Sequence, residues 1–327
     1  METQHRTVSV VMCTFNGEKY LKEQLDSILR QTYPILELIV QDDCSTDNTY
    51  SIVEEYAQKY PFIKLFRNEK QLGVNQNFFS AMQRSQGDLI AISDQDDIWE
   101  DNKLEIQVAA IGDKMCCAGK SAHFSSENVS FTVDMRAANH TLLRQLFVGT
   151  FSGHNMLITR QLLDKTIHLS DFYPFRTYDS ILAIVATAHN SAVFVESVLV
   201  RHRRHLNNST KTYSNPTGNQ KTLKNLFNTA KESWYLYRKL RPQILRIIRS
   251  EEKFLSEIHS QEPVLQESIK MLHWYSSRYF IDFLRLSIFC ARRGNLLTFA
   301  QGKQSFSTCL RGAFFPIYSA GYFRFLL

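Results

Sequence analysis

The chain has 327 residues, of which 44% are hydrophobic and 21% charged, a composition typical of a folded globular protein rather than a disordered, collagen-like or disulfide-rich chain. Its length allows about two domains. The net charge of +6 is unevenly distributed: residues 1–200 carry 17 basic and 25 acidic side chains, whereas residues 201–327 carry 21 basic and 7 acidic ones.

Strand-like and helix-like segments alternate along the first 92 residues. Short β-branched or apolar runs predict strands, and amphipathic or capped segments between them predict helices. The predicted strands are 7–13, 36–40, 62–66 and 88–92, and the predicted helices are 17–32, 45–60 and 74–84. Pro34 ends the first helix, and Ser45 or Thr46 caps the second. This alternation implies βαβ units, a parallel sheet and right-handed crossovers.

Acidic residues follow two of these predicted strands. Asp42 and Asp43 come after the second strand, and Asp94, Asp96 and Asp97 come after the fourth. Ligands of parallel sheets bind beyond the carboxyl ends of the strands, so these acids are expected at one edge. Each acid alone also suits a turn or a helix cap. Together, with no Lys or Arg between them, they repel one another and favour a bound divalent cation such as Mg²⁺ or Mn²⁺.

Two other kinds of site are not supported. The sequence has neither G-x-G-x-x-G nor G-x-x-x-x-G-K-[ST], so a Rossmann dinucleotide site and a P-loop are both excluded, and bound phosphates would be neutralised mainly through the metal. The six cysteines form no C-x-x-C pair, which predicts free thiols and argues against a structural zinc site.

The motifs resemble a known enzyme family. TVSVVMCTFNGEKYLKEQLDSILRQTYPILELIVQDDCSTDNT resembles the opening of family 2 glycosyltransferases with the GT-A fold, and SDQDDIWEDNKL resembles the D-x-D region of their bacterial rhamnosyltransferase-like branch. Between these segments, Asn68, Gly73 and Asn77 match the spacing N-x-x-x-x-G-x-x-x-N. The resemblance runs from residue 7 to about residue 210, with the motifs in the family's order.

This resemblance implies the fold and the domains. The fold class is α/β, a GT-A-type three-layer α/β/α sandwich with a mostly parallel, mixed central sheet, followed by a helical C-terminal region. The expected catalytic domain is 1–215, with a nucleotide-binding half at 1–110 and an acceptor half at 111–215. Residues 216–327 form the basic helical region.

The resemblance also implies site residues. The loop after the first strand and Asp42 would hold the nucleobase and ribose, with Asp42 accepting the imide N–H of uracil or thymine. Asp96 is the expected direct metal ligand, and Asp94 a ribose or water-mediated contact. The implied donor-binding residues are Thr14, Phe15, Asn16, Asp42, Asp43, Asn77, Asp94 and Arg203, and the implied metal ligands are Asp94, Asp96 and His205.

An inverting transfer needs a base that takes a proton from the acceptor hydroxyl. The candidate is Asp179 in FRTYDSILAIVA, which also suits a helix N-cap. Similar proteins carry His-Asp-Trp-Trp at this place. This chain keeps the Asp but has Tyr178, Ser180 and Ile181 around it, which puts acceptor specificity in doubt.

Two further segments resemble parts of the family's site. In GTFSGHNMLITRQLL, Gly153 would let the backbone approach a sugar ring, and His154 and Asn155 are either acceptor contacts or a core-packed turn. In VRHRRHLNN, His205 would complete the metal's coordination, and Arg203 and Arg204 would offset diphosphate charge. The alternative for the second segment is an exposed basic loop.

The basic region beyond residue 220 is predicted to be helical. Helices are expected at 223–240 and 251–258, and an amphipathic period runs through 269–293. Packing against the catalytic domain and peripheral contact with an anionic membrane both stay open. Nucleic-acid binding is not indicated, because the charges lie on no reading motif and the acidic half would repel phosphates. With no apolar run long enough to cross a bilayer and no signal-peptide pattern, the expected location is cytoplasmic, with the inner face of the membrane as a peripheral option.

Together these features predict a metal-dependent, inverting hexosyl- or deoxyhexosyltransferase with Mg²⁺ or Mn²⁺ as cofactor. Its donor would be a UDP- or dTDP-linked rhamnose or hexose, and its acceptor a saccharide or lipid-linked saccharide of a cell-surface polysaccharide or lipopolysaccharide. Two alternatives stay open. One is a non-catalytic sugar-nucleotide-binding scaffold. The other is a sugar-phosphate nucleotidyltransferase, which should carry a glycine-rich basic loop where this chain has TFNGEKY.

Overall fold

The computed structural model describes residues 6–125, 140–172, 176–205, 223–297 and 304–326. The chain forms two compact units, each described here by itself. The first comprises Met1–Ser130, Phe151–Ala186 and Asn190–Thr210, and the second Phe131–Thr150, Thr187–His189 and Lys211–Leu327. The domain boundary expected between residues 215 and 216 lies outside the described residues. Two segments expected in the acceptor half, Phe131–Thr150 and Thr187–His189, belong to the second unit.

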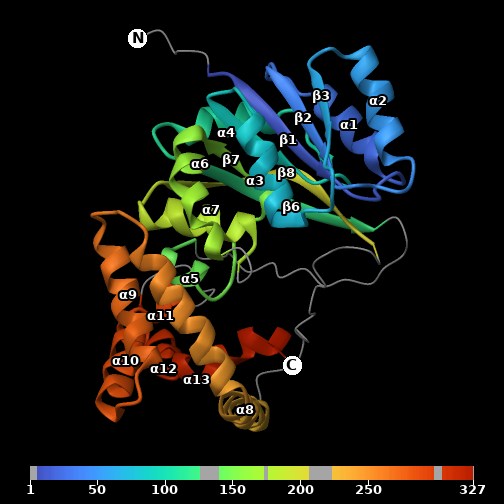
Figure 1. Cartoon of the computed structure of the whole chain (residues 1–327). Helices are drawn as coiled ribbons and strands as arrows, with labels where there is room; N and C mark the ends of the chain where they lie inside the picture. Colours follow the sequence, from blue (N-terminus) through green and yellow to red (C-terminus); the bar gives the residue numbers. More distant parts are fainter. Residues whose placement is uncertain (1–5, 126–139, 173–175, 206–222, 298–303, 327) are drawn as a thin grey trace. The chain divides into compact units, whose positions relative to one another are not determined.

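The first unit is built on one eight-stranded sheet in the order β3-β2-β1-β4-β7-β6-β8-β5 (Figure 1). Its strands are β1 (Val8–Thr14), β2 (Glu37–Asp42), β3 (Ile63–Arg67), β4 (Leu89–Ser93), β5 (Ile98–Trp99), β6 (Cys116–Ser125), β7 (Leu157–Thr159) and β8 (Ala192–Arg204). The run β3-β2-β1-β4 is parallel, β7 is antiparallel to β4 and β6, and β5 is antiparallel to β8. The expected mixed, mostly parallel sheet is therefore confirmed.

Helices cover both faces of this sheet. They are α1 (Leu21–Leu29), α2 (Thr49–Lys59), α3 (Val74–Arg84), α4 (Lys103–Ile111), α6 (Arg160–Thr166), α7 (Tyr178–Ala188) and the 3₁₀ turns η1 (Gly153–Asn155) and η2 (Ile167–Phe172). Along β1, Val8, Val10 and Met12 point into a core shared with α1, α2 and α4. Because side chains alternate along a strand, Val11 points to the opposite face, where α3 packs on β1 and β2. Both faces of the parallel strands are buried, which explains their continuous apolar sequence.

The predicted elements of the first 92 residues all occur, and helix 74–84 has the predicted bounds. The second helix begins at Thr49 instead of following a cap at Ser45 or Thr46. The Ser45 hydroxyl is used elsewhere, since it donates to Asp42 Oδ1 at 2.5 Å. Asp47 Oδ1 instead accepts the Thr49 N–H at 3.0 Å and satisfies the start of the helix. All six cysteines are free thiols, as predicted.

The described part of the second unit is helical. It contains α5 (Leu142–Gln145), α8 (Leu223–Ser256), α9 (Pro263–Ser276), α10 (Phe280–Arg292), α11 (Gly294–Leu297), α12 (Phe306–Ala313), α13 (Phe315–Tyr318) and η3 (Ser319–Leu326). α10 and α12 approach to backbone contact, because a Cβ on Gly312 would lie 2.1 Å from the Cys290 carbonyl oxygen.

Two sequence-based expectations for this unit are wrong. Separate helices at 223–240 and 251–258 were expected, but α8 continues through Pro242 as one helix. A single amphipathic period was expected over 269–293, but it is broken between α9 and α10. Ser277 accounts for the break, because its hydroxyl accepts the Tyr279 N–H at 3.2 Å and donates to Asp282 Oδ2 at 2.7 Å, offering the backbone an alternative to the helix.

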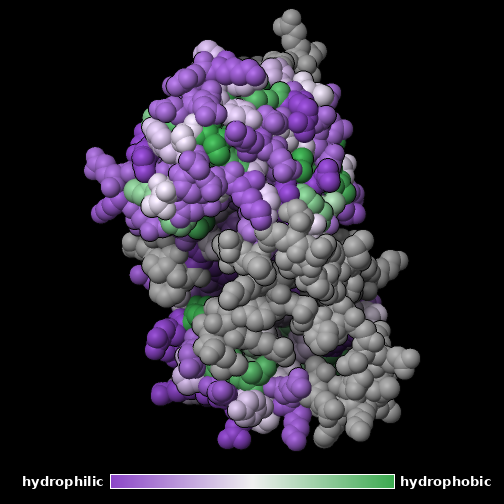
Figure 2. Space-filling view, turned by 90° about the vertical axis from the view of Figure 1, so that its right-hand side faces the viewer, coloured by the Kyte–Doolittle hydropathy of each residue, from purple (hydrophilic) through white to green (hydrophobic). Residues whose placement is uncertain are grey.

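None of the described helices combines the length and apolar character that crossing a bilayer requires. On the face shown in Figure 2, hydrophilic residues dominate the coloured surface of the first unit, and its hydrophobic residues appear as small separate patches.

Candidate active site

The loops after β1, β2 and β4 lie at one edge of the sheet, because parallel strands end on the same side. Gln95, in the loop after β4, latches the loop after β1: its Oε1 accepts the Phe15 N–H at 2.9 Å and its Nε2 donates to the Phe15 carbonyl at 3.0 Å. Asn16 adopts a positive φ of 48°, and its N–H donates to Ser45 Oγ at 2.9 Å. Three loops that are distant in sequence therefore form one surface, as the sequence predicted.

Asp42 is buried within this surface. Its Oδ1 accepts the Thr14 hydroxyl at 3.0 Å and the Ser45 hydroxyl, and its Oδ2 accepts the Ser45 N–H at 2.9 Å. The guanidinium of Arg67 lies 3.7 Å from Oδ2. The expected contact with a nucleobase imide is not what this geometry provides, because both oxygens are used inside the loop and the side chain has no exposed surface.

Asp43 and Asn77 belong to a second internal network. Asp43 Oδ1 accepts the Leu72 N–H and the Asn68 amide, each at 2.7 Å, and its Oδ2 accepts the Gly73 N–H at 2.8 Å. Asn77 accepts from the Asn68 amide at 2.8 Å and is buried. The N-x-x-x-x-G-x-x-x-N spacing thus places residues that shape the loop before α3, and Asn77 does not reach a free surface.

The acids after β4 are arranged differently. Carboxylate oxygens of Asp94, Asp96 and Asp97 all lie within 4.8 Å of one another. Loss of hydration, and then the charges of Asp96 and Asp179, raise the pKa of Asp94 to about 8. Burial, and then Asp94 and Asp96, raise the pKa of Asp97 well above its usual value. The residues therefore fit a divalent cation, since such an ion supplies the positive charge that these oxygens lack.

His205 lies beside this acidic cluster. Its Nε2 lies 2.8 Å from Asp96 Oδ2, and its ring packs on the ring of Tyr20 with centroids 5.1 Å apart. The structure thus places His205 next to Asp96, which lies close to Asp94, and metal binding by these three residues stays a prediction.

Arg203 is buried beside the cluster rather than exposed. Its Nε donates to the Asp96 carbonyl at 2.9 Å, its terminal nitrogen donates to Glu23 Oε2 at 2.9 Å, and its backbone N–H donates to Asp97 Oδ1 at 2.9 Å. The guanidinium carbon lies 4.4 Å from the Tyr20 ring centroid and 4.6 Å from that of Phe124. The diphosphate contact expected of Arg203 is therefore replaced by contacts that hold the loop after β4.

Asp179, the candidate base, lies in the first turn of α7. Its Oδ2 accepts the Gly153 N–H at 3.1 Å, and its Oδ1 accepts the Ser180 N–H at 2.8 Å and the Thr177 hydroxyl. Its charge contributes to the raised pKa of Asp94, so the two carboxylates share one environment. The acids nominated from distant parts of the chain thus converge within the first unit.

The segment at η1 is packed in the interior. A Cβ on Gly153 would lie 2.0 Å from the Tyr178 hydroxyl, so the missing side chain makes room for Tyr178 and not for a sugar ring. Tyr178 itself stacks on Phe78 with centroids 4.1 Å apart. His154 and Asn155 are buried, which matches the core-packed turn and not the acceptor contacts.

Behind the acidic cluster, His154 lies beside two half-buried histidines, His123 and His202, that sequence reasoning missed. The rings of His154 and His202 lie 4.4 Å apart, and those of His202 and His123 lie 5.1 Å apart. Burial lowers the pKa of His154 to about 3 and that of His202 to about 2. His123 and His202 are register partners of β6 and β8, a pairing that no local pattern reveals.

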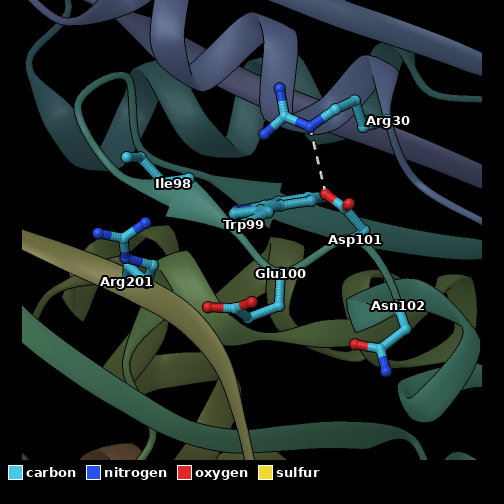
Figure 3. Close-up of a pocket in the computed structure, with 7 residues that line it drawn as sticks. All are labelled: Arg30, Ile98, Trp99, Glu100, Asp101, Asn102 and Arg201. Carbon is cyan, nitrogen blue, oxygen red and sulfur yellow. Dashed lines mark hydrogen bonds and ion pairs between the residues drawn. The ribbon is translucent and has the colours of Figure 1, made fainter.

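A separate polar pocket of about 410 Å³ lies beside β5 (Figure 3). In Figure 3, the Arg30–Asp101 ion pair, at 3.3 Å, lies on one side of Trp99 and Glu100 lies on the other. Ile98, Asn102 and Arg201 complete the lining. None of the residues nominated from the sequence lines this pocket.

Comparison with known proteins identifies relatives. Residues 9–167 match the family model described as glycosyl transferase family 2. WfgD from Escherichia coli, a UDP-Glc:alpha-D-GlcNAc-diphosphoundecaprenol beta-1,3-glucosyltransferase, is 40% identical over 51% of this chain and 67% of its own. The dTDP-rhamnosyl transferase RfbG from Shigella flexneri is 34% identical over 36% of this chain and 40% of its own. TuaG from Bacillus subtilis, which is named a putative teichuronic acid biosynthesis glycosyltransferase, is 34% identical over 33% of this chain and 43% of its own length.

Solved structures share the fold. Staphylococcus aureus TarS (residues 1–349), crystallised with UDP-GlcNAc, aligns with a TM-score of 0.56 at 18% identity, over 89% of this chain and 82% of its own. The mannosyltransferase PcManGT from Pyrobaculum calidifontis, crystallised with GDP-Man and Mn²⁺, aligns with a TM-score of 0.52 at 18% identity, over 98% and 85% of the two chains. The expected GT-A-type fold with a helical C-terminal region is confirmed.

Proposed function

Because the chain belongs to family 2 of the glycosyltransferases, we propose that it is an inverting glycosyltransferase of cell-surface polysaccharide synthesis. The proposed donor is a UDP- or dTDP-linked hexose or deoxyhexose, and the proposed acceptor is a saccharide carried on a lipid diphosphate. The names of WfgD and RfbG support these two classes. The observation that carries the proposal is the convergence of Asp94, Asp96, His205 and Asp179 within one unit.

Asp179 is the proposed base, and Oδ2 is the atom that takes the proton. A carboxylate has about four lone-pair positions. Two donors occupy Oδ1 and one occupies Oδ2, so Oδ2 keeps a position for the acceptor hydroxyl. The Gly153 and Ser180 N–H groups hold the carboxylate in one orientation, which lowers the entropic cost of aligning it with the attacking oxygen.

Asp94, Asp96 and His205 are the proposed holders of Mg²⁺ or Mn²⁺, which when bound stabilises the negative charge that develops on the departing diphosphate. Arg203 is proposed as a positioning residue, since it fixes the Asp96 carbonyl and the Asp97 carboxylate from β8. The nucleoside is proposed to bind along the backbone of Thr14–Asn16, which Gln95 holds in place.

Release of the nucleotide product tests this proposal. The purified protein is incubated with UDP- and dTDP-sugars and Mn²⁺, and the nucleotide released is measured with and without lipid-linked acceptor. Nucleoside diphosphate is the expected product. Pyrophosphate would instead indicate a nucleotidyltransferase, and donor binding without turnover would indicate a scaffold protein.

Substitution of the base sharpens this test. Asp179→Asn is expected to lower the rate of transfer by about 10²–10⁴-fold, the usual contribution of a general base, and to leave donor binding intact. Asp164→Asn, on the exposed side of α6, is the matched control and is expected to keep the wild-type rate. Transfer by Asp179→Asn at the wild-type rate would remove Asp179 as the base.

Peripheral membrane contact through the second unit is also proposed, which suits a lipid-linked acceptor. Ile281, Leu284 and Ile288 are exposed along one side of α10, and Arg285 and Arg292 flank them. Such a face matches an anionic bilayer surface. Sedimentation with vesicles of phosphatidylglycerol and phosphatidylcholine, compared with phosphatidylcholine alone, tests it, and the double variant Ile281→Ser/Ile288→Ser is expected to lower binding to the anionic vesicles.

A further inference from the structure

A second group of side chains that could bind a metal ion shares Asp97 with the acidic cluster and is more buried than the cluster. Asp97 follows β4, His154 lies in η1 and His202 lies in β8, and one ligand atom of each lies within 4.8 Å of the others. The proposed glycosyl transfer uses none of the three. They come from three elements that the fold brings together, so the grouping is a feature of the tertiary structure.

The first observation that favours a bound cation in this group concerns Asp97. Its side chain is fully buried, and its Oδ1 accepts the Arg203 N–H at 2.9 Å. Its Oδ2 has no hydrogen-bond partner among the described residues and lies 4.0 Å from His154 Nδ1. Leaving a buried carboxylate oxygen unpaired destabilises the folded state. A cation at this oxygen would remove that cost.

The histidines present their nitrogens to the same place. The Nε2 of His154 lies 2.9 Å from Ser121 Oγ, which also accepts from the Asn155 amide at 3.1 Å. This contact orients the ring, so that Nδ1 lies 3.8 Å from Asp94 Oδ2 and 4.0 Å from Asp97 Oδ2. Metal-bound histidines are typically held in this way, with the second nitrogen hydrogen-bonded to the protein. The Nδ1 of His202 is buried and has no partner among the described residues.

We propose that Asp97 Oδ2, His154 Nδ1 and an imidazole nitrogen of His202 bind a transition-metal ion of the Zn²⁺ class, at a site that adjoins the one formed by Asp94, Asp96 and His205. Two imidazoles with one carboxylate favour Zn²⁺ or Co²⁺, whereas all-oxygen sites favour Mg²⁺. Bonds of about 2.0–2.1 Å in tetrahedral geometry place ligand atoms about 3.4 Å apart. The side chains therefore need to turn inward by about an ångström on binding.

The position of this site suggests a structural role. His154 follows Gly153, whose N–H holds the proposed base Asp179, and Asp97 ends the loop that carries Asp94 and Asp96. An ion bound by Asp97, His154 and His202 would join these two segments to β8. The site would thus stabilise the arrangement of the acids without contacting either substrate.

Metal titration of the whole chain tests the proposal without any assay of transfer. The protein is stripped with EDTA, returned to buffer containing excess Mg²⁺, and titrated with Co²⁺ or Zn²⁺. Wild type is expected to bind about one equivalent, with Co²⁺ giving the visible absorption of a low-coordinate nitrogen and oxygen site. Failure of the wild-type protein to bind Co²⁺ or Zn²⁺ in the presence of Mg²⁺ would overturn the proposal.

Variants locate the bound ion. His154→Gln keeps an amide near the Nε2 position that contacts Ser121 but removes Nδ1, and His202→Gln removes the second imidazole. Each is expected to weaken Co²⁺ binding by at least about 100-fold. Asp96→Asn and His205→Gln change residues of the adjoining site formed by Asp94, Asp96 and His205. They are the matched controls and are expected to retain the Co²⁺ spectrum. If His154→Gln and His202→Gln both retain Co²⁺ binding, or if both controls lose it, the ion binds elsewhere and the proposal is overturned.

Discussion

Two groups of acidic residues at the same sheet edge differ in the hydrogen-bond donors that surround them. After β2, the oxygens of Asp42 and Asp43 accept hydrogen bonds from neighbouring backbone and side-chain donors, and both residues are buried in the loops that they shape. After β4, Asp94, Asp96 and Asp97 face one another, and Asp97 Oδ2 has no partner among the described residues. An acidic residue at a strand end is therefore not by itself evidence for a cation site. The donors around each carboxylate decide whether it supports the fold or is available to a cation.

The largest expected effect is the loss of transfer on changing an acid of the second group. Asp96→Asn is expected to lower the rate of transfer by about 10³-fold, because a metal ligand stabilises charge that develops only in the transition state. Its urea midpoint should stay close to that of wild type. If Asp96→Asn instead lost much stability and kept its rate of transfer, Asp96 would support the fold and would not serve as a metal ligand.

Asp43→Asn should show the reverse pattern. The amide cannot accept from the Leu72 and Gly73 N–H groups and the Asn68 amide together, so the free energy of unfolding is expected to fall by about 2–3 kcal/mol. Urea unfolding measures this. The control is Glu69→Gln, exposed in the loop between β3 and α3 that Asp43 contacts, which is expected to change the free energy of unfolding by less than about 0.5 kcal/mol.

Gly153→Ala tests the packing that supports the base. The added Cβ would lie 2.0 Å from the Tyr178 hydroxyl, so either Tyr178 or the η1 turn must move. Overpacking of this kind costs about 1–3 kcal/mol. The variant should also lose rate, since the Gly153 N–H orients Asp179. Wild-type stability and rate would show that this contact is not needed.

A pH dependence of stability is also expected from Asp94, weakened by solvent screening because its side chain is partly exposed. Its pKa is about 8 in the folded chain, compared with about 3.9 in an unfolded one, so between these values the folded state binds a proton that the unfolded state lacks. The metal-free protein should therefore lose stability as the pH rises from about 4 to about 8. Thermal melting in EDTA across this window measures the loss.

Two comparisons isolate the contribution of Asp94. Asp94→Asn should flatten the pH dependence and melt above wild type at pH 8, because it removes the repulsion from Asp96 and Asp179. Added Mn²⁺ should reduce the loss in wild type, because the ion favours the ionised carboxylate. A wild-type melting temperature that rises with pH in EDTA would contradict the assigned sign.

Local pattern determined much of this protein. The β-branched runs and helical periods of residues 7–92 predicted every strand and helix there, because side-chain alternation and chain-breaking residues act over a few positions. The same patterns placed Asp94 and Asp96 at the edge where the structure has them, since strand direction determines which loops meet. The order of the motifs indicated the family, and this resemblance nominated His205 and Asp179 as site residues.

Tertiary structure alone decided the partner of each polar group. Nothing near Arg203 in the sequence shows that Glu23 and the rings of Tyr20 and Phe124 will surround it. Likewise, the meeting of His154 with His202 depends on the register of β8 against β6 and on where η1 packs. Such contacts join positions that are up to 180 residues apart, and their energies depend on burial and distance, which no short stretch of sequence contains.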